Sequence, residues 1–250
     1  MRVHHEIDGR GPALVLAASL GTSLEVWDEV VPALADRFQV VRFDHRGHGR
    51  TPAPPGPYTM ADLAGDVIEL ADELGLERVS VCGLSIGGAV AMWLAANAPE
   101  RIDRLVLACT APRFLTPEAW RERAALVREG GTEVVVDAVI SRWFTPRLFD
   151  ERPEVPAAFR ATFCAVDREA YAGCCDALAQ WDFSGELGRI AAPTLVVAAA
   201  ADTVAPPEQA ETIAAGIPDA RLVVLDGAAH LAPAEQPEEF AAAVREHVGP

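Results

Sequence analysis

The clearest structural signal in the chain lies at residues 79–88, which read Val79-Ser80-Val81-Cys82-Gly83-Leu84-Ser85-Ile86-Gly87-Gly88. An apolar run typical of a strand leads into the pattern G-x-S-x-G, and small residues typical of a tightly packed helix follow up to Asn97. Such a strand–helix turn is sharp, so its neighbours must be glycine, and it presents the central hydroxyl at the carboxyl edge of a sheet. We therefore predict Ser85 as a nucleophile.

A serine nucleophile needs a base and an acid that orients the base. On a sheet of this kind the acid and then the histidine follow the serine along the chain. Among the six histidines, only His230 follows Ser85, comes shortly after an apolar run and lies in a Gly/Ala loop. We predict Asp202, at the end of the run 195–201, as the acid. Asp226 is the rival, but it lies very close in sequence to His230.

Two backbone N–H groups should stabilise the oxyanion that forms when a serine attacks a carbonyl. The first is predicted at Ile86, directly after the nucleophile and at a helix N-terminus. The second is expected in the loop 17–21 that follows an early strand. Counting back from Trp27 assigns it to the N–H of Leu20.

The rest of the chain alternates strand-like and helix-like segments, which predicts an α/β protein with a mostly parallel central sheet and helices on both faces. Strands are expected at 3–7, 13–17, 38–43, 78–82, 105–109, 194–199 and 221–225, and helices at 27–36, 59–74, 86–97, 208–215 and 237–248. Between about 113 and 188 the pattern is helical with little strand. We therefore predict a core of residues 1–112 and 189–250 with an inserted helical cap at 113–188.

Composition excludes several classes of function. The 250 residues carry a formal net charge of −16, which disfavours nucleic acid and anionic membranes as partners. The five cysteines form no C-x-x-C pair, so neither a disulfide framework nor a zinc site is expected. The loop 44–49 contains two histidines, but a tight turn held by Asp44 and Arg46 is the favoured interpretation over a metal site. No signal-peptide or membrane-spanning run is visible, and a cytoplasmic location is expected.

Beyond these patterns, the sequence resembles the 3-oxoadipate enol-lactonases of the α/β-hydrolase superfamily over essentially its whole length. The resemblance rests on these stretches: Ser19–Thr22 with Trp27, Asp44–Gly49, Pro55–Thr59, Cys82–Gly88, Arg142–Pro146, Tyr171–Cys175, His230–Ala232 and Glu235–Pro237. The two stretches in the cap, Arg142–Pro146 and Tyr171–Cys175, are the most specific, because caps diverge most among such enzymes. One departure is Ala18, where the family usually has Asn.

The resemblance implies the α/β-hydrolase fold and hydrolysis of 3-oxoadipate enol-lactone to 3-oxoadipate, in protocatechuate and catechol breakdown, without metal or organic cofactor. The substrate would be a small anionic lactone. Its carboxylate requires a cation or several N–H donors. Arg142 is one candidate for the cation, and Arg113 and Arg46 are others. Trp27 and Trp143 are candidates for the apolar wall of the substrate site.

Four alternatives remain open from the sequence. The same residues fit a general carboxylesterase, a cofactor-free perhydrolase or a hydrolase of carbon–carbon bonds. A non-catalytic ligand receptor on the same fold is the alternative from a different class, although the intact Ser85, Asp202 and His230 argue against it. The sequence does not decide the oligomeric state.

Overall fold

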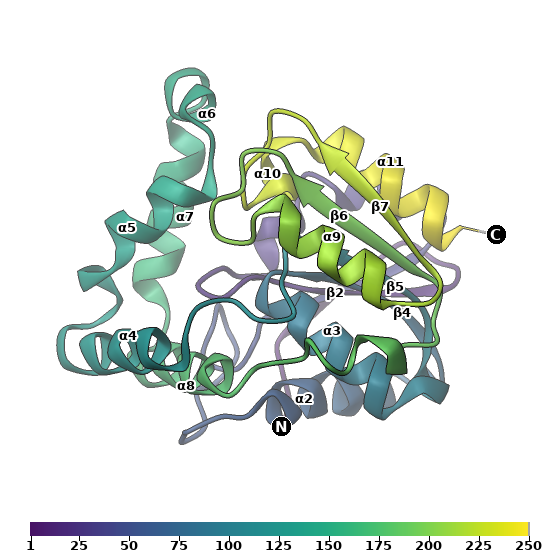
Figure 1. Ribbon diagram of the computed structural model, residues 1–250, viewed down its shortest axis with the longest axis horizontal. Coiled ribbons are helices and arrows are strands. Elements are labelled where there is room, and N and C mark those ends of the chain that lie inside the picture. The colour runs from purple at the N-terminus through teal and green to yellow at the C-terminus, as the bar shows by residue number, and fades with distance from the viewer. Residues whose placement is uncertain (250) are drawn as a thin grey trace.

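The computed structural model describes residues 1–249, in which seven strands form one sheet (Figure 1). The order across the sheet is β1-β3-β2-β4-β5-β6-β7, and only the β1–β3 pair is antiparallel. The strands are β1 (His5–Asp8), β2 (Ala13–Ala17), β3 (Gln39–Phe43), β4 (Val79–Leu84), β5 (Ile102–Ala108), β6 (Thr194–Ala199) and β7 (Ala220–Leu225). This mostly parallel sheet confirms the predicted fold class.

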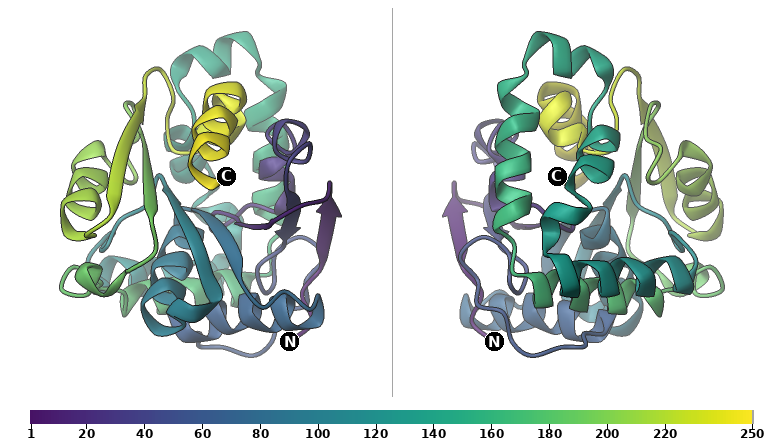
Figure 2. Two further views of the ribbon diagram at one scale, coloured as in Figure 1. Left: turned by 90° about the vertical axis from the view of Figure 1, so that its right-hand side faces the viewer. Right: turned by 90° about the vertical axis from the view of Figure 1, so that its left-hand side faces the viewer.

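The central strands are apolar on both faces because helices cover the sheet on both sides. Every residue of β4 and β6 is buried, whereas the edge strand β7 leaves Val224 45% exposed. In Figure 2 the yellow helix α11 lies on the opposite side of the sheet from the blue helices α2 and α3. The core helices are α1 (Val31–Leu34), α2 (Met60–Glu73), α3 (Ile86–Asn97), α9 (Pro207–Gly216), α10 (Ala232–Glu235) and α11 (Pro237–Val248).

Five further helices stand between β5 and β6, within the range 113–188 that the sequence assigns to a cap. They are α4 (Pro117–Gly130), α5 (Val136–Trp143), α6 (Pro146–Glu151), α7 (Glu154–Ala165) and α8 (Arg168–Ala179). Helix α4 begins at an N-cap, with the Thr116 hydroxyl accepting a hydrogen bond from Ala119 N–H and with Pro117 in the first turn. Figure 1 shows these helices on the left, on the side toward which the arrowheads of β6 and β7 point.

Short 3₁₀ turns complete the chain, and one of them corrects a prediction. The helix expected at 27–36 is instead a 3₁₀ turn, η1 (Leu24–Trp27), followed by the single-turn helix α1. Pro32 has no N–H to donate to a preceding turn and is tolerated only where a helix starts, so the helix cannot run through it from Trp27. The other 3₁₀ turns are η2 (Pro99–Arg101), η3 (Thr132–Val134) and η4 (Leu187–Arg189).

The helix expected at 59–74 forms as α2, with a capping box at its N-terminus. The Thr59 hydroxyl accepts a hydrogen bond from Asp62 N–H at 3.2 Å, and the Asp62 carboxylate accepts one from Thr59 N–H at 2.8 Å. Across residues 1–249, none of the helices has the length and apolar character that a membrane crossing requires.

Candidate active site

Ser85 lies at the turn between β4 and α3, the strand and helix expected on either side of it. Its backbone has φ 57° and ψ −116°, a conformation that residues other than glycine rarely adopt. The flanking glycines are required by close contacts: a Cβ on Gly83 would lie 2.2 Å from the Gly87 carbonyl oxygen, and a Cβ on Gly87 would lie 2.1 Å from that of Ala17. The strained turn thus holds the Ser85 hydroxyl at the carboxyl end of a central strand.

The structure brings Ser85, His230 and Asp202 together from three strand ends. His230 Nε2 lies 2.9 Å from Ser85 Oγ, and His230 Nδ1 lies 2.8 Å from Asp202 Oδ2. His230 and Asp202 are 1% and 3% exposed. Because the carboxylate can only accept, Nδ1 carries the proton of the neutral ring, which leaves Nε2 free to take the proton of the Ser85 hydroxyl.

Asp202 is itself held in place by the turn that follows β6. Its Oδ1 accepts hydrogen bonds from Val204 N–H at 2.7 Å and from Ala205 N–H at 3.0 Å, so Oδ2 remains for His230. The rival carboxylate, Asp226, is exposed at the end of β7. The geometry therefore favours Asp202 over Asp226 as the partner of His230.

The loop that carries His230 is attached to both the cap and the core. Leu231 N–H donates to the Trp143 carbonyl at 3.0 Å, which ties the loop to the end of α5. The buried carboxylate of Glu235 accepts from Ala229 N–H at 2.9 Å and from Thr145 N–H at 3.1 Å. Glu235 thus links the residue before His230 to the cap, a role that was not predicted from the sequence.

The two residues predicted as oxyanion donors, Leu20 and Ile86, both lie near Ser85. Ile86 is the first residue of α3, so its N–H has no acceptor within the helix. Leu20 belongs to the loop after β2 and lines the same cavity as Ser85 and His230. The contact of Gly87 with the Ala17 carbonyl, described above, sets the start of α3 against this loop. The arrangement can place two N–H groups around one carbonyl oxygen.

The cavity at Ser85 has a volume of about 40 Å³ and lies between the sheet edge and the cap. The cap side chains that line it are those of Trp120, Arg123, Val139, Arg142, Trp143 and Tyr171. Arg142 and Trp143, two of the three residues predicted to contact substrate, thus line the cavity at Ser85. Trp27 does not: it is fully buried, and its ring packs 6.0 Å from that of Phe240 in α11, which makes it a core residue.

Arg123 and Trp120 are cavity residues that were not predicted from the sequence. They are three positions apart on α4, so they share one face of that helix, and Arg123 Cζ lies 4.9 Å from the centre of the Trp120 ring. This spacing was visible in the sequence, but nothing there indicated which face of α4 meets Ser85.

The cap side of the cavity carries positive charge without a counter-ion. Within residues 1–249 neither Arg123 nor Arg142 forms an ion pair, and Arg142 donates from Nε to the Ala138 carbonyl at 3.0 Å. Burial and then the charge of Arg123 lower the pKa of Arg142. The buried Nε1–H of Trp120 has no acceptor. These three groups suit an anionic oxygen ligand.

The other two arginines considered from the sequence are already paired elsewhere. Arg46 binds the Asp66 carboxylate through Nε at 2.8 Å and Nη2 at 2.9 Å. Arg113 lies 3.5 Å from Asp182 near the surface. Neither lines the cavity at Ser85, so both are set aside as carboxylate ligands.

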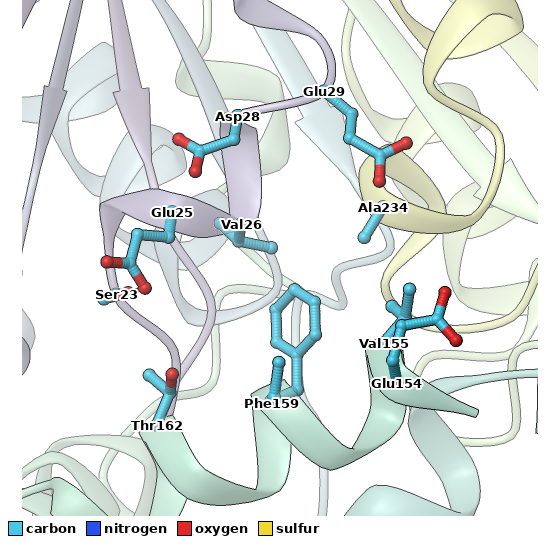
Figure 3. Close-up of a pocket in the computed structure, with 11 residues that line it drawn as sticks. Ser23, Glu25, Val26, Asp28, Glu29, Glu154, Val155, Phe159, Thr162 and Ala234 are labelled. Atoms are coloured by element: carbon cyan, nitrogen blue, oxygen red, sulfur yellow. Dashed lines mark hydrogen bonds between the residues drawn. The ribbon is translucent and has the colours of Figure 1, made fainter. Parts of the chain in front are cut away.

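A larger cavity, of about 290 Å³, lies between η1 and α7 (Figure 3). Phe159 projects into it from α7, and none of Ser85, Asp202 and His230 lines it. Its acidic lining residues are Glu25, Asp28, Glu29 and Glu154, with no basic side chain among the lining residues. An anionic ligand would be repelled there, which leaves the smaller cavity at Ser85 as the candidate active site.

Comparison with known proteins gives consistent matches. Residues 12–141 match the family model described as alpha/beta hydrolase fold. The chain is 38% identical to 3-oxoadipate enol-lactonase 2 of Acinetobacter baylyi, covering 87% of this chain and 81% of that protein. It is 40% identical to an enol-lactonase structure from Burkholderia xenovorans, with a TM-score of 0.96 and coverage of 99% and 96%. A thermophilic esterase from Thermogutta terrifontis, solved with malate bound, is 32% identical with a TM-score of 0.94, over 98% and 92% of the two chains.

Proposed function

The chain belongs to the α/β hydrolase family and is a hydrolase of esters or lactones, and we propose that its substrate is 3-oxoadipate enol-lactone. In this proposal Ser85 is the nucleophile, His230 the base and Asp202 the residue that orients the base. The product is 3-oxoadipate, an intermediate of protocatechuate and catechol breakdown. The names of the enol-lactonases from A. baylyi and B. xenovorans support the choice of substrate.

The observation that carries the proposal is the pair of arginines opposite Ser85. The enol-lactone is a five-membered ring with an acetate arm, so it presents a carbonyl and a carboxylate on one small molecule. Ser85 lines the same cavity as Arg123 and Arg142, which have no carboxylate partner within residues 1–249. Two guanidinium groups without a carboxylate partner, in a protein of formal charge −16, are best explained by an anionic ligand.

The reaction follows from the geometry of the three side chains. Ser85 Oγ attacks the lactone carbonyl carbon while its proton passes to His230 Nε2, 2.9 Å away. The N–H groups of Leu20 and Ile86 stabilise the oxyanion, and one such donor contributes about 3 kcal/mol. Asp202 stabilises the imidazolium through Nδ1.

Collapse of the tetrahedral intermediate breaks the ring C–O bond and opens the lactone. The leaving group is an enolate, which takes up the proton that His230 received from Ser85 and becomes the ketone of the product, so that His230 is again neutral. An enolate is a better leaving group than an amide nitrogen, so this step needs little acid assistance. Water, deprotonated by His230, then hydrolyses the ester to Ser85 and releases the product.

The test is hydrolysis of enzymatically generated enol-lactone by the wild type and three variants. Ser85→Ala should abolish turnover. Arg142→Gln and Arg123→Gln should each raise KM for the lactone roughly tenfold, the loss expected for one charged hydrogen bond, with little change toward neutral phenyl acetate. Arg113→Gln is the matched control. If the wild type hydrolyses phenyl acetate but not the lactone, or if the arginine variants weaken both substrates equally, the proposed substrate is wrong.

A further inference from the structure

The loop that carries the Leu20 N–H is held at three consecutive peptide groups by hydrogen bonds to Thr22, His45 and His48. The Ala18 carbonyl lies 3.0 Å from His45 Nε2. The Ser19 carbonyl accepts from both Thr22 N–H at 3.1 Å and the Thr22 hydroxyl at 2.8 Å. Gly21 N–H donates to His48 Nε2 at 3.0 Å. Because Leu20 N–H lies opposite the Ser19 carbonyl in one peptide plane, these bonds fix its direction.

The hydrogen bonds require His48 to be neutral, and they fix the nitrogen that carries a proton on each ring. His48 Nε2 accepts from Gly21, so the ring proton is on Nδ1, which donates to the Arg46 carbonyl at 3.0 Å. His45 Nε2 faces a carbonyl and must donate, whereas its buried Nδ1 has no hydrogen-bond partner. A protonated His48 would turn a donor toward Gly21 N–H and break the bond that holds the loop.

The surroundings keep the two rings neutral. His45 and His48 are 2% and 0% exposed, and their ring centres lie 6.2 Å apart. Burial lowers the pKa of each to about 4, helped for His45 by the charge of Arg46 and for His48 by His45, and opposed for His48 by Asp44 and Asp167. Neither ring lines the cavity at Ser85, so neither contacts a bound ligand.

We propose that His45 and His48 are positioning residues for the oxyanion hole, which hold the peptide groups on either side of Ser19–Leu20 so that Leu20 N–H points at the oxyanion formed on Ser85. The inference rests on the proposed role of Ser85 as nucleophile but not on the identity of the substrate. Both residues act through the loop backbone, so their effect should appear in the transition state and not in ground-state binding.

The experiment compares two amides at each position, because they differ in reach by one methylene. The glutamine amide can replace ring Nε2, so His48→Gln keeps an acceptor for Gly21 N–H and His45→Gln keeps a donor for the Ala18 carbonyl. His48→Asn and His45→Asn are too short for either contact. The matched control is His247→Asn. His247 is a buried histidine of α11, away from the cavity, and its Nε2 lies 3.1 Å from the Pro193 carbonyl oxygen.

Each variant is assayed with 4-nitrophenyl acetate, and phenylboronic acid serves as the mimic of the tetrahedral intermediate. We expect the asparagine variants to lose roughly 10- to 100-fold in kcat, less than the 10²–10³ that removal of a donor costs, with KM within twofold. Boronate affinity should fall by a similar factor. The glutamine variants should stay within threefold of the wild type, as should His247→Asn.

Two results would overturn the inference: kcat and boronate affinity unchanged in the asparagine variants, or equal losses in the asparagine and glutamine variants. Circular dichroism and Tm identify variants that fail to fold. If one asparagine variant does not fold, the wild type and the glutamine variant of that residue are compared, and the other position decides. Because the ester and the boronate are generic, a failure to hydrolyse enol-lactone would count against the proposed substrate alone.

Discussion

Replacing Asp202 by Asn tests the charge of this side chain while its size stays the same. Asp202→Asn keeps the size of the group but replaces an acceptor of His230 Nδ1–H by an amide that favours the other tautomer, with Nε2 protonated and unable to act as a base. We expect kcat to fall roughly 10⁴-fold with a small change in KM. Asp226→Asn is the control, since that carboxylate is exposed and should be dispensable. A large loss in the Asp226 variant, or none in the Asp202 variant, would reassign the acid.

Because His45 and His48 are buried, we expect the free energy of unfolding to depend on pH. In the unfolded chain each ring has a pKa near 6.5, whereas burial lowers it to about 4 in the folded protein. Below pH 6.5 the unfolded state therefore binds protons that the folded state does not, and stability falls until about pH 4. The loss at pH 5 is about 2 kcal/mol for each ring.

This pH dependence is measured as urea unfolding at pH 7 and pH 5. The double variant His45→Gln/His48→Gln has no titrating ring at these positions, so its free energy of unfolding should change less between the two pH values, by up to about 4 kcal/mol. An equally steep change in the double variant would show that other groups cause the loss.

How far single residues could be predicted from the sequence depended on whether a local pattern marks them. Ser85 stands in a motif whose strain has one structural solution, and the chain order then narrows the search for His230 and Asp202. Arg123 was missed because packing against α8 decides which face of α4 points toward Ser85, and the sequence of α4 alone does not show this. The contacts of His45 and His48 join residues 27 positions apart, and no short pattern encodes them.

At the level of elements, the short helix α10 and the end of α5 are coupled through Glu235. Glu235→Ala would leave two buried N–H groups, those of Ala229 and Thr145, without acceptors, at a cost of about 2–4 kcal/mol. Since Ala229 precedes His230, we also expect kcat to fall several-fold. Thermal unfolding and ester kinetics measure the two effects, with exposed Glu239→Ala in α11 as the control. Loss of stability with kcat unchanged would limit Glu235 to a structural role.

Element types were easier to predict than their ends. Strands buried on both faces, such as β4 and β6, show long apolar runs, and α2 and α4 carry N-terminal caps that mark where they start. The prediction of a helix at 27–36 was wrong because it followed the apolar residues and overlooked Pro32, which a helix interior does not tolerate. Helix α10 has four residues, too few to show a helical period, and was missed for that reason.

The cap and the sheet edge border a cavity of about 40 Å³, which has room for only a few water molecules. A lactone ring with an acetate arm is larger, so we expect cap side chains to move when it binds. The partly exposed Arg123 and Arg142 are the movable members of the wall, whereas Trp143 and Tyr171 are buried at 3% and 1% exposure. Substrate entry and carboxylate capture would then be the same movement.

For the whole molecule, a formal charge of −16 opposes the approach of an anionic substrate, while Arg123 and Arg142 attract it at the cavity. The repulsion comes from charges spread over the whole surface, whereas the attraction comes from two arginines at the cavity and acts over a shorter distance. Salt at about 0.1 M screens charges beyond about 10 Å, so it weakens the repulsion from the distant surface more than the attraction inside the cavity. We therefore expect kcat/KM for the enol-lactone to rise roughly two- to threefold between about 10 and 200 mM NaCl. Neutral phenyl acetate should show no such rise, and Asp226→Asn, which removes one exposed charge outside the cavity lining, should respond like the wild type. A fall in kcat/KM with salt would mean that the arginine pair dominates at long range and that the net charge has no influence on substrate capture.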